Sequence, residues 1–198
     1  MKTNYVLIDY ENVQPEAMEV LSDEHFKVIV FVGENQTKVT FEVASALQRM
    51  GERAEYVKIT GNGKNALDFH IAYFLGQLAI KEPDAYFHIV SKDTGFDPLI
   101  QHLKNDKILA CRSKDVTDIP IVKAATSKSP TEKLAVVIGA LQRQGAAKPR
   151  AVKTLTSMIH STFQKQLSEQ EVTSLLNALE KQGVVTVNGT KVSYTLPA

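Results

Sequence analysis

The chain has 198 residues, of which 43% are hydrophobic and 23% are charged, and this is the composition of an ordinary globular protein. Its single cysteine, Cys111, excludes an internal disulfide and a zinc site built from cysteines. The first residues show no signal-peptide pattern, and no apolar run approaches the ~20 residues that a membrane span needs. A reducing, cytoplasmic compartment without a membrane is therefore expected.

The net charge of +1 hides an uneven distribution along the chain. Residues 1–120 carry 13 Lys and Arg against 18 Asp and Glu, a net charge of −5. Residues 121–198 carry 10 against 4, a net charge of +6, and the two sum to +1. This split predicts two modules with different electrostatic roles, although drift in surface charge alone would also produce it.

Strand and helix patterns alternate over residues 1–120. Short apolar runs predict strands, and apolar residues spaced by three and four predict helices. In chain order the expected elements are strands at 4–9 and 26–33, a helix at 38–51, a strand at 54–60, a helix at 65–81, a strand at 85–91, a helix at 97–105 and a strand near 107–112. This alternation predicts an α/β fold, with helices on both faces of a parallel sheet.

The composition changes after residue 120. Residues 121–129, which read IVKAATSKS, lie between two prolines and are rich in small residues and lysine. Such a segment is typical of a linker. The expected domains are therefore 1–120 and 130–198.

The second domain shows three helix patterns and a hairpin pattern. Capping boxes at Ser129 and Ser168 predict the starts of the first and third helices, and a second helix is expected over 150–163. Asn188-Gly189, flanked by alternating residues, predicts a two-residue turn between two strands. Three helices followed by a hairpin is the layout of a winged helix-turn-helix domain.

Acidic residues gather where the strands of the first domain are expected to end. Ligand sites in parallel α/β sheets form outside the carboxyl ends of the strands. Clustered carboxylates repel one another unless a cation compensates, and Mg²⁺ or Mn²⁺ prefers such hard oxygen ligands. A metal so bound supports the attack of water on a phosphodiester. The pattern therefore predicts a catalytic metal site made of Asp9, Asp68, Asp93 and Asp97.

Each of these residues also has a purely structural interpretation. Asp9 would cap the turn after the first strand, and Asp97, which precedes Pro98, would cap the short helix. Asp68 has the weakest structural reason, because Asp is a poor residue inside a helix. Asn12 is expected either to orient Asp9 or to contact the substrate.

Two groups of residues are candidates for contacts with phosphate. The segment 61–65, GNGKN, enters a helix, whose first backbone N–H groups bind anions, and Lys64 would contact a phosphate there; a flexible loop is the alternative. The segment is not a Walker A sequence, because no Ser or Thr follows Lys64. In the second domain, nucleic-acid phosphates are expected to contact Lys148, Arg150, Lys153 and Lys191.

Four ordered motifs, LIDYENV, FVGENQ, GNGKNALDFHIAYFLG and HIVSKDTGFDPLI, resemble those of the PIN-like nucleases, especially the NYN group, over residues 4–112. Members of that group are usually ribonucleases that depend on Mg²⁺ or Mn²⁺. The resemblance implies metal-binding positions at Asp9, Asp68 and Asp93, with Asn12 beside Asp9.

The sequence departs from this family at one position. The usual form has two Asp residues two positions apart after the fourth strand, whereas here the second position is Gly95 and the next carboxylate is Asp97. Either Asp97 substitutes from a shifted position or the site is one ligand short. The second domain is similar in layout to the winged-helix or LOTUS-like domains that accompany some NYN proteins.

Two hypotheses of different classes follow. The first is a metal-dependent endoribonuclease with a basic C-terminal module, whose partners would be RNA, DNA as a second nucleic acid, and another copy of the chain in a homodimer. The second is a non-catalytic nucleic-acid-binding or assembly protein that retains the fold. Phosphatase or phosphotransfer chemistry is disfavoured, because the first strand ends in D-Y-E rather than D-x-D.

Overall fold

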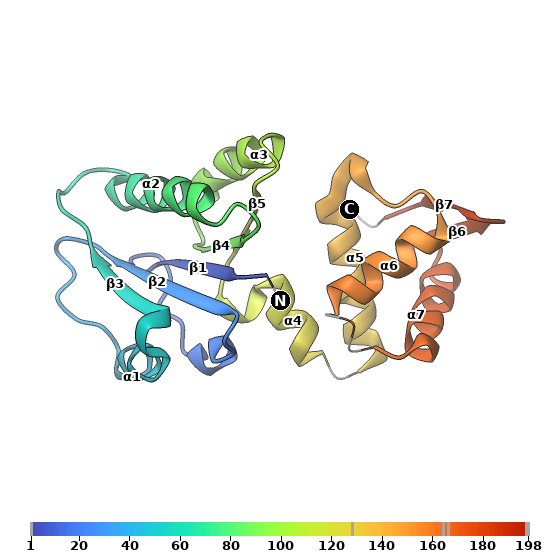
Figure 1. The fold of residues 1–198 in the computed structure, drawn as a ribbon, viewed down its shortest axis with the longest axis horizontal. Helices are drawn as coiled ribbons and strands as arrows, with labels where there is room; N and C mark the ends of the chain where they lie inside the picture. The colour runs from blue at the N-terminus through green and yellow to red at the C-terminus, as the bar shows by residue number, and fades with distance from the viewer. Residues whose placement is uncertain (1, 128, 164, 166, 197–198) are drawn as a thin grey trace. The chain divides into compact units, whose positions relative to one another are not determined.

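The computed structural model describes residues 2–127, 129–163, 165 and 167–196. The chain divides into two compact units, Met1–Ile119 and Pro120–Ala198 (Figure 1).

The first unit is built on a parallel sheet of five strands in the order β3-β2-β1-β4-β5. The strands are β1 (Asn4–Asp9), β2 (Phe26–Val32), β3 (Ala54–Lys58), β4 (Tyr86–Val90) and β5 (Leu109–Ser113). Its helices are α1 (Phe41–Met50), α2 (Ala66–Lys81) and α3 (Asp97–Asn105), with 3-10 turns η1 (Met18–Leu21), η2 (Gly51–Arg53), η3 (Thr94–Phe96) and η4 (Val116–Asp118). Figure 1 shows α2 and α3 on one face of the sheet and α1 on the other. The predicted α/β fold is confirmed.

The sequence of β1 reflects its place at the centre of this sheet. All six of its residues are buried, and successive side chains of a strand point to opposite faces. Leu7 packs in one core cluster with Ile71 and Leu75 of α2, while Val6 and Ile8 are buried on the opposite face. Because both faces are covered, the strand is a continuous apolar run rather than an alternating one. Its last residue, Asp9, is therefore an exception that needs a chemical reason.

The strand order changes direction between β1 and β4. From β1 the chain winds outward through β2 to β3, then returns to β4 on the other side and continues to β5. Neighbouring carboxyl ends at such a switch point leave a crevice in which ligands bind. The residues that end β1 and follow β4 lie at this crevice.

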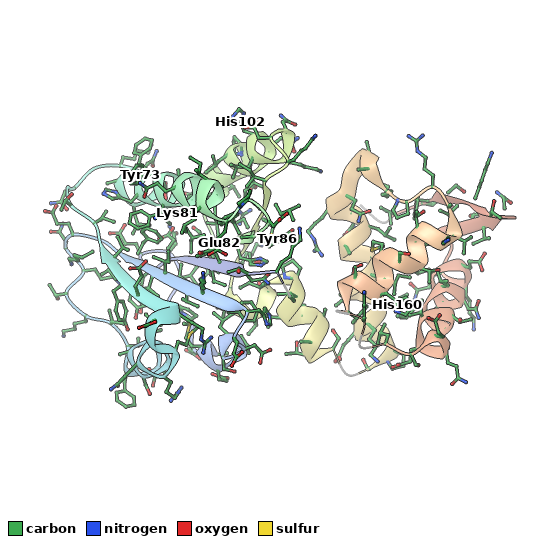
Figure 2. The ribbon with its side chains drawn as sticks, in the orientation of Figure 1. Tyr73, Lys81, Glu82, Tyr86, His102 and His160 are labelled. Atoms are coloured by element: carbon green, nitrogen blue, oxygen red, sulfur yellow. The ribbon has the colours of Figure 1, made fainter. Side chains whose placement is uncertain are left out.

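A polar network joins β1 and β2 near their amino-terminal ends, at the opposite end of β1 from Asp9. Tyr5 Oη donates to Glu82 Oε1 at 2.6 Å, and Lys27 Nζ lies 2.6 Å from the same oxygen. Glu82 follows α2 and is labelled in Figure 2. The hydrogen bonds from Lys27 and Tyr5 lower the pKa of Glu82 to about 2. This network belongs to the scaffold.

The second unit contains four α-helices among its described residues and a two-stranded antiparallel sheet. Its elements are α4 (Pro120–Thr126), α5 (Pro130–Gln144), a 3-10 turn η5 (Gly145–Ala147), α6 (Val152–Thr162), α7 (Glu169–Lys181), β6 (Val185–Asn188) and β7 (Lys191–Tyr194). Both predicted capping boxes are present, at Ser129 and Ser168. The core is formed by apolar residues of α5, α6 and α7, among them Leu141, Leu155 and Leu179.

Two details of the second unit differ from the sequence prediction. The segment 121–129 was expected to be a linker, but α4 occupies most of it and buries Val122 and Ala124. The hairpin turn was expected at Asn188-Gly189, but Asn188 pairs with Lys191, so Gly189 and Thr190 form the turn. Gly189 has a φ of 62°, which glycine adopts without a steric penalty.

The backbone before α6 pairs with the hairpin. Ala151 forms an antiparallel bridge with Lys191, Val152 N donates to Thr190 O, and Val192 N donates to Arg150 O. The start of α6 is thereby fixed beside β7. No helix among the described residues has both the length and the apolar character to cross a membrane.

Candidate active site

Asp9 ends β1 as a buried carboxylate that is held from several sides. Asp9 is only 1% exposed. Oδ1 accepts a hydrogen bond from Asn12 N at 3.1 Å, and Oδ2 accepts from Asn12 Nδ2 at 2.7 Å and from Ser91 Oγ at 2.8 Å. The structure thus brings Asn12 to Asp9, and Asp9 also caps the following turn. The capping and the functional interpretations of Asp9 are compatible.

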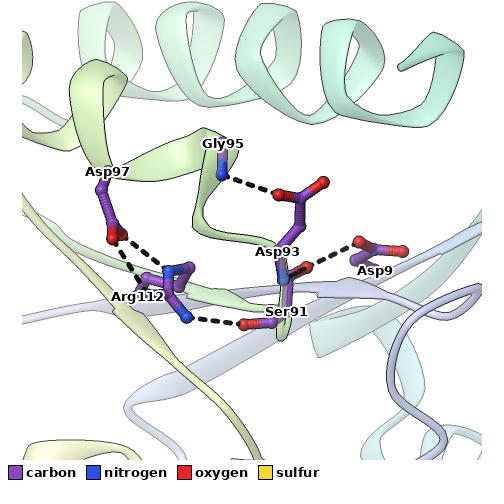
Figure 3. A network of polar contacts seen from close by, with 6 residues as sticks. All are labelled: Asp9, Ser91, Asp93, Gly95, Asp97 and Arg112. Carbon is purple, nitrogen blue, oxygen red and sulfur yellow. Dashed lines mark hydrogen bonds and ion pairs between the residues drawn. The ribbon is translucent and has the colours of Figure 1, made fainter. Parts of the chain in front are cut away.

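Ser91 links Asp9 to Asp93 across the switch point (Figure 3). It follows β4, is fully buried, and donates to Asp9 while accepting from Asp93 N at 3.0 Å. Asp93 Oδ1 accepts from Gly95 N at 2.7 Å, so this side chain also caps η3. Ser91 was not among the predicted site residues, although it follows a predicted strand and lies within the motif HIVSKDTGFDPLI.

Asp68 reaches the same region from the first turn of α2. Burial raises the pKa of the Asp68 carboxyl, and the charges of Asp9, Asp93 and Glu11 raise it further. The helix begins after Asn65, which has a left-handed φ of 65° and makes no side-chain cap. Burial and the neighbouring carboxylates thus both disfavour the charged form of Asp68.

One pocket contains these residues. It is lined by Asp9, Glu11, Asn12, Glu34, Ile59, Gly61, Asn62, Gly63, Asn65, Ala66, Leu67, Asp68 and Asp93. The segment 61–65 thus contributes its glycines and asparagines, whereas Lys64, the predicted phosphate contact, is exposed and does not line the pocket. No Lys, Arg or His is among the described residues that line it. Five carboxylates therefore share a pocket without a cationic side chain.

Glu11 and Glu34 extend the acidic set beyond the prediction. Glu11 lies directly against Gly33 at the end of β2, where an added Cβ would come within 1.6 Å of Glu11 Oε1. Any side chain at position 33 would therefore displace Glu11 from its present place. The sequence signal for both was the motif FVGENQ beside the motif LIDYENV, whose spatial proximity follows from the pairing of β1 with β2.

The structure places Asp97 apart from the other predicted ligands. Asp97 does not line the pocket; its two oxygens accept from Arg112 Nε at 2.7 Å and from Arg112 Nη2 at 3.0 Å (Figure 3). These hydrogen bonds lower the pKa of the Asp97 carboxyl. Nor does Asp97 cap α3, because it is the first residue of the helix and the N-cap is Phe96. The Asp97 carboxylate pairs instead with Arg112 of β5.

The donor chemistry of the pocket suits a hard divalent cation, but the carboxylates are not grouped as a finished site. Mg²⁺ and Mn²⁺ prefer oxygen ligands, and the pocket presents carboxylate and amide oxygens without a competing cation. Among the described residues, however, no three His, Cys, Asp or Glu are placed to hold a metal ion together. A bound metal would therefore require some of these side chains to move.

The charge on Asp68 should destabilise the metal-free protein at neutral pH. A carboxyl whose pKa is raised by folding contributes stability below its unfolded pKa of 3.8 and loses it as pH rises through the folded value. In chelator, Asp68→Asn should therefore raise the midpoint of thermal unfolding at pH 7 by a few degrees, since ~1 kcal/mol shifts the midpoint of domains of 60–250 residues by roughly 2–8 °C. The gain should shrink as the pH approaches 4.

The matched control for this measurement is Asp84→Asn. Asp84 is a surface carboxylate with a 96% exposed side chain, so its removal changes the net charge equally without touching the pocket. It should leave the midpoint nearly unchanged. An Asp68→Asn protein less stable than the parent at pH 7 in chelator would show that Asp68 makes a stabilising contact instead.

The predicted basic residues of the second unit lie near one another in the fold. The bridge between Ala151 and Lys191 brings Arg150 and Lys191 together, and Lys153 lies in the first turn of α6. These three side chains are exposed. Lys148 is half-buried, and its Nζ donates to Gly145 O. Arg150, Lys153 and Lys191 therefore expose their positive charge to solvent.

Comparison with known proteins gives a match for the first unit. Residues 3–113, more than half of the chain, match the family model of the PIN domain. The match covers the whole parallel sheet and all of the pocket-lining residues. No curated protein matches the chain.

Proposed function

Because the chain belongs to the PIN domain family, we propose that it is a metal-dependent endoribonuclease that hydrolyses RNA phosphodiester bonds. One observation carries the proposal: Asp9, Asp68 and Asp93, delivered by β1, α2 and the segment after β4, line one pocket at the switch point of the sheet. We assign the chain to the NYN group on its four motifs, and place its action in the cytoplasm.

Asp9, Asp68 and Asp93 would hold Mg²⁺ or Mn²⁺ in this pocket. Such an ion, when bound, lowers the pKa of a bound water and neutralises charge on the phosphate. Asn12 and Ser91 keep the Asp9 carboxylate in one orientation through hydrogen bonds of 2.7 and 2.8 Å. Residues of the segment 61–65 also line the pocket, and their backbone and amide groups would contact the substrate.

The test is cleavage by the purified full-length chain. Single-stranded RNA, duplex RNA and single-stranded DNA of one sequence should be incubated with Mn²⁺, with Mg²⁺ and with chelator. We expect cleavage of RNA with either metal, slower or no cleavage of DNA, and none in chelator. Equal cleavage in chelator would contradict metal dependence, and absence of cleavage in every condition would contradict the nuclease assignment.

We propose further that the second unit is a winged-helix module that binds nucleic acid through phosphates. Support comes from the order α5, α6, α7 and the hairpin β6–β7, and from the pairing of β7 with the backbone before α6. The exposed Arg150, Lys153 and Lys191 supply the charge. Helix α7 of this module is unsuited to reading bases, because its first turn is acidic: Glu169 lies 3.4 Å from His160 (labelled in Figure 2), and Glu171 pairs with Lys133 at 2.7 Å.

The alternative is a non-catalytic protein that binds nucleic acid or assembles with other proteins. Two observations favour it: Gly95 stands at a usual acidic position, and no three metal-binding side chains are grouped among the described residues. A side chain at position 95 would also crowd Asp93, because an added Cβ lies 3.1 Å from Asp93 Oδ1. RNA binding without cleavage in any metal would support this alternative.

A further inference from the structure

Arg112 contacts both ends of the segment that carries Asp93. From β5, its Nη1 donates to Ser91 O at 3.2 Å, at the start of the segment. Its Nε and Nη2 donate to the two oxygens of Asp97, at the end of the segment and the start of α3. The Arg112 side chain is only 13% exposed. One guanidinium therefore closes the segment Ser91–Asp97 into a loop (Figure 3).

Hydrogen bonds hold the start of the loop, where Asp93 lies, through Ser91. Asp93 N donates to Ser91 Oγ, and Gly95 N donates to Asp93 Oδ1. Both bonds join residues two positions apart, so neither of them reaches the far end of the loop at Asp97. At its start, the loop is held by the bond from Ser91 Oγ to Asp9 and by β4. At its far end, Arg112 is the polar link to the sheet that the structure describes.

We propose that Arg112 and Asp97 act together as positioning residues that hold Asp93 in the pocket. This rests on the proposed function of the same site. Neither residue lines the pocket, so neither is expected to touch the metal or the substrate. Their effect is geometric, because displacement of a catalytic group by about 1 Å costs roughly 100-fold in rate. The bidentate pair suits this role, since a planar guanidinium fixes direction as well as distance.

Electrostatics support the same assignment. The pKa of Arg112 is raised by its hydrogen bonds to Asp97, then by the charge of Asp97 and by that of Asp93. Arg112 thus lies close enough to Asp93 to sense its charge while its donors are directed to Ser91 and Asp97. Lysine would replace it only in part, because an ammonium is a single point of charge and cannot span both anchors in a fixed plane.

The experiment compares four variants of the full-length chain: Asp97→Ala, Arg112→Ala, the double variant, and Arg112→Lys. The readouts are kcat and KM for RNA cleavage with Mn²⁺, and hydrogen exchange of the Asp93 and Gly95 amides without metal. We expect each alanine variant to lower kcat by about 10–100-fold with little change in KM, as for groups that orient metal ligands. The double variant should be no worse than the poorer single variant, because the two residues act as a unit.

Arg112→Lys tests the geometry without a large cavity, and it should lie between the parent and Arg112→Ala in both readouts. Glu82→Gln is the matched control. It weakens an ion pair of the same unit with Lys27 at the other end of the strands, so it should change neither kcat nor the two amides. A loss of kcat in Glu82→Gln that matches Arg112→Ala would overturn the inference in favour of general stability.

Several results would overturn the inference. If Asp97 were an independent metal ligand, Arg112→Ala would release it, so kcat would hold or rise while Asp97→Ala lost activity. Additive losses in the double variant would likewise show separate roles. If the parent cuts no RNA, the proposed function fails, and hydrogen exchange alone tests the positioning role. Faster exchange of the Asp93 and Gly95 amides in both alanine variants would then support that role, and unchanged exchange would overturn it.

Discussion

Asp93→Asn is expected to lower the rate of RNA cleavage by more than about 100-fold, while the fold and its stability are retained. Loss of a group that only orients a metal ligand already costs roughly 10–100-fold, so loss of a ligand should cost more. The fold should persist because an Asn side-chain oxygen can still accept the hydrogen bond from Gly95 N, and Asn caps about as well as Asp. Initial rates and thermal unfolding of both proteins are the measurements.

The comparison needs two further proteins. Asp84→Asn removes the same charge from the exposed surface and should cut RNA at the parental rate. Asp93→Ala should lose the same activity but also about 1 kcal/mol of stability, because it removes the cap of η3. An Asp93→Asn protein that cleaves RNA as fast as the parent would remove Asp93 from the proposed site.

The carboxylates of the pocket could be found from the sequence because backbone topology alone brings them together. Asp9 ends a strand, and Asp93 follows another, and parallel strands that alternate with helices present their carboxyl ends at one edge. Asp68 could be added to this group because its helix was expected to start at the same edge of the sheet. These inferences depend on the order of the elements and do not require any knowledge of side-chain contacts.

The partners of those carboxylates could not be found in the same way. Ser91 lies within a family motif and Arg112 in none, and the role of each depends on which side chain it faces on a neighbouring element. Asp97 is an example: its spacing in the sequence predicts a ligand or a cap, but its hydrogen bonds with Arg112 of β5 could not be foreseen. The family pattern could not settle it either, because the departure at Gly95 concerns the same loop.

Local composition also misled at the domain boundary. Residues 121–129 combine small residues and lysines between two prolines, which is typical of linkers, yet proline is also favoured in the first turn of a helix. In α4, Pro120 takes that place, and burial of Val122 and Ala124 stabilises a helix of seven residues that is too short to be stable alone. Tertiary packing therefore stabilises α4, and the local sequence alone does not reveal that packing.

RNA binding by the second unit should weaken about 20-fold between 50 and 200 mM salt. Three phosphate contacts, from Arg150, Lys153 and Lys191, give a slope of about −2.1 in the logarithm of affinity against that of salt for a single strand. Lys148 is omitted because its ammonium bonds to Gly145 O. The measurement is fluorescence anisotropy with the full-length Asp93→Asn protein, in which the RNA stays intact, on two unrelated sequences of equal length.

Single substitutions locate this charge in the second unit. Lys153→Gln should reduce the slope by about 0.7 and weaken binding equally for both RNA sequences, because a phosphate contact carries no base information. Lys181→Gln removes the same charge from the exposed last residue of α7, which is not part of the segment that pairs with β7, and should leave the slope unchanged. Equal effects of the two variants would mean that net charge alone attracts the RNA. A slope near zero in the parent would mean that this unit contacts a protein instead, because phosphate binding always releases counterions and so depends on salt.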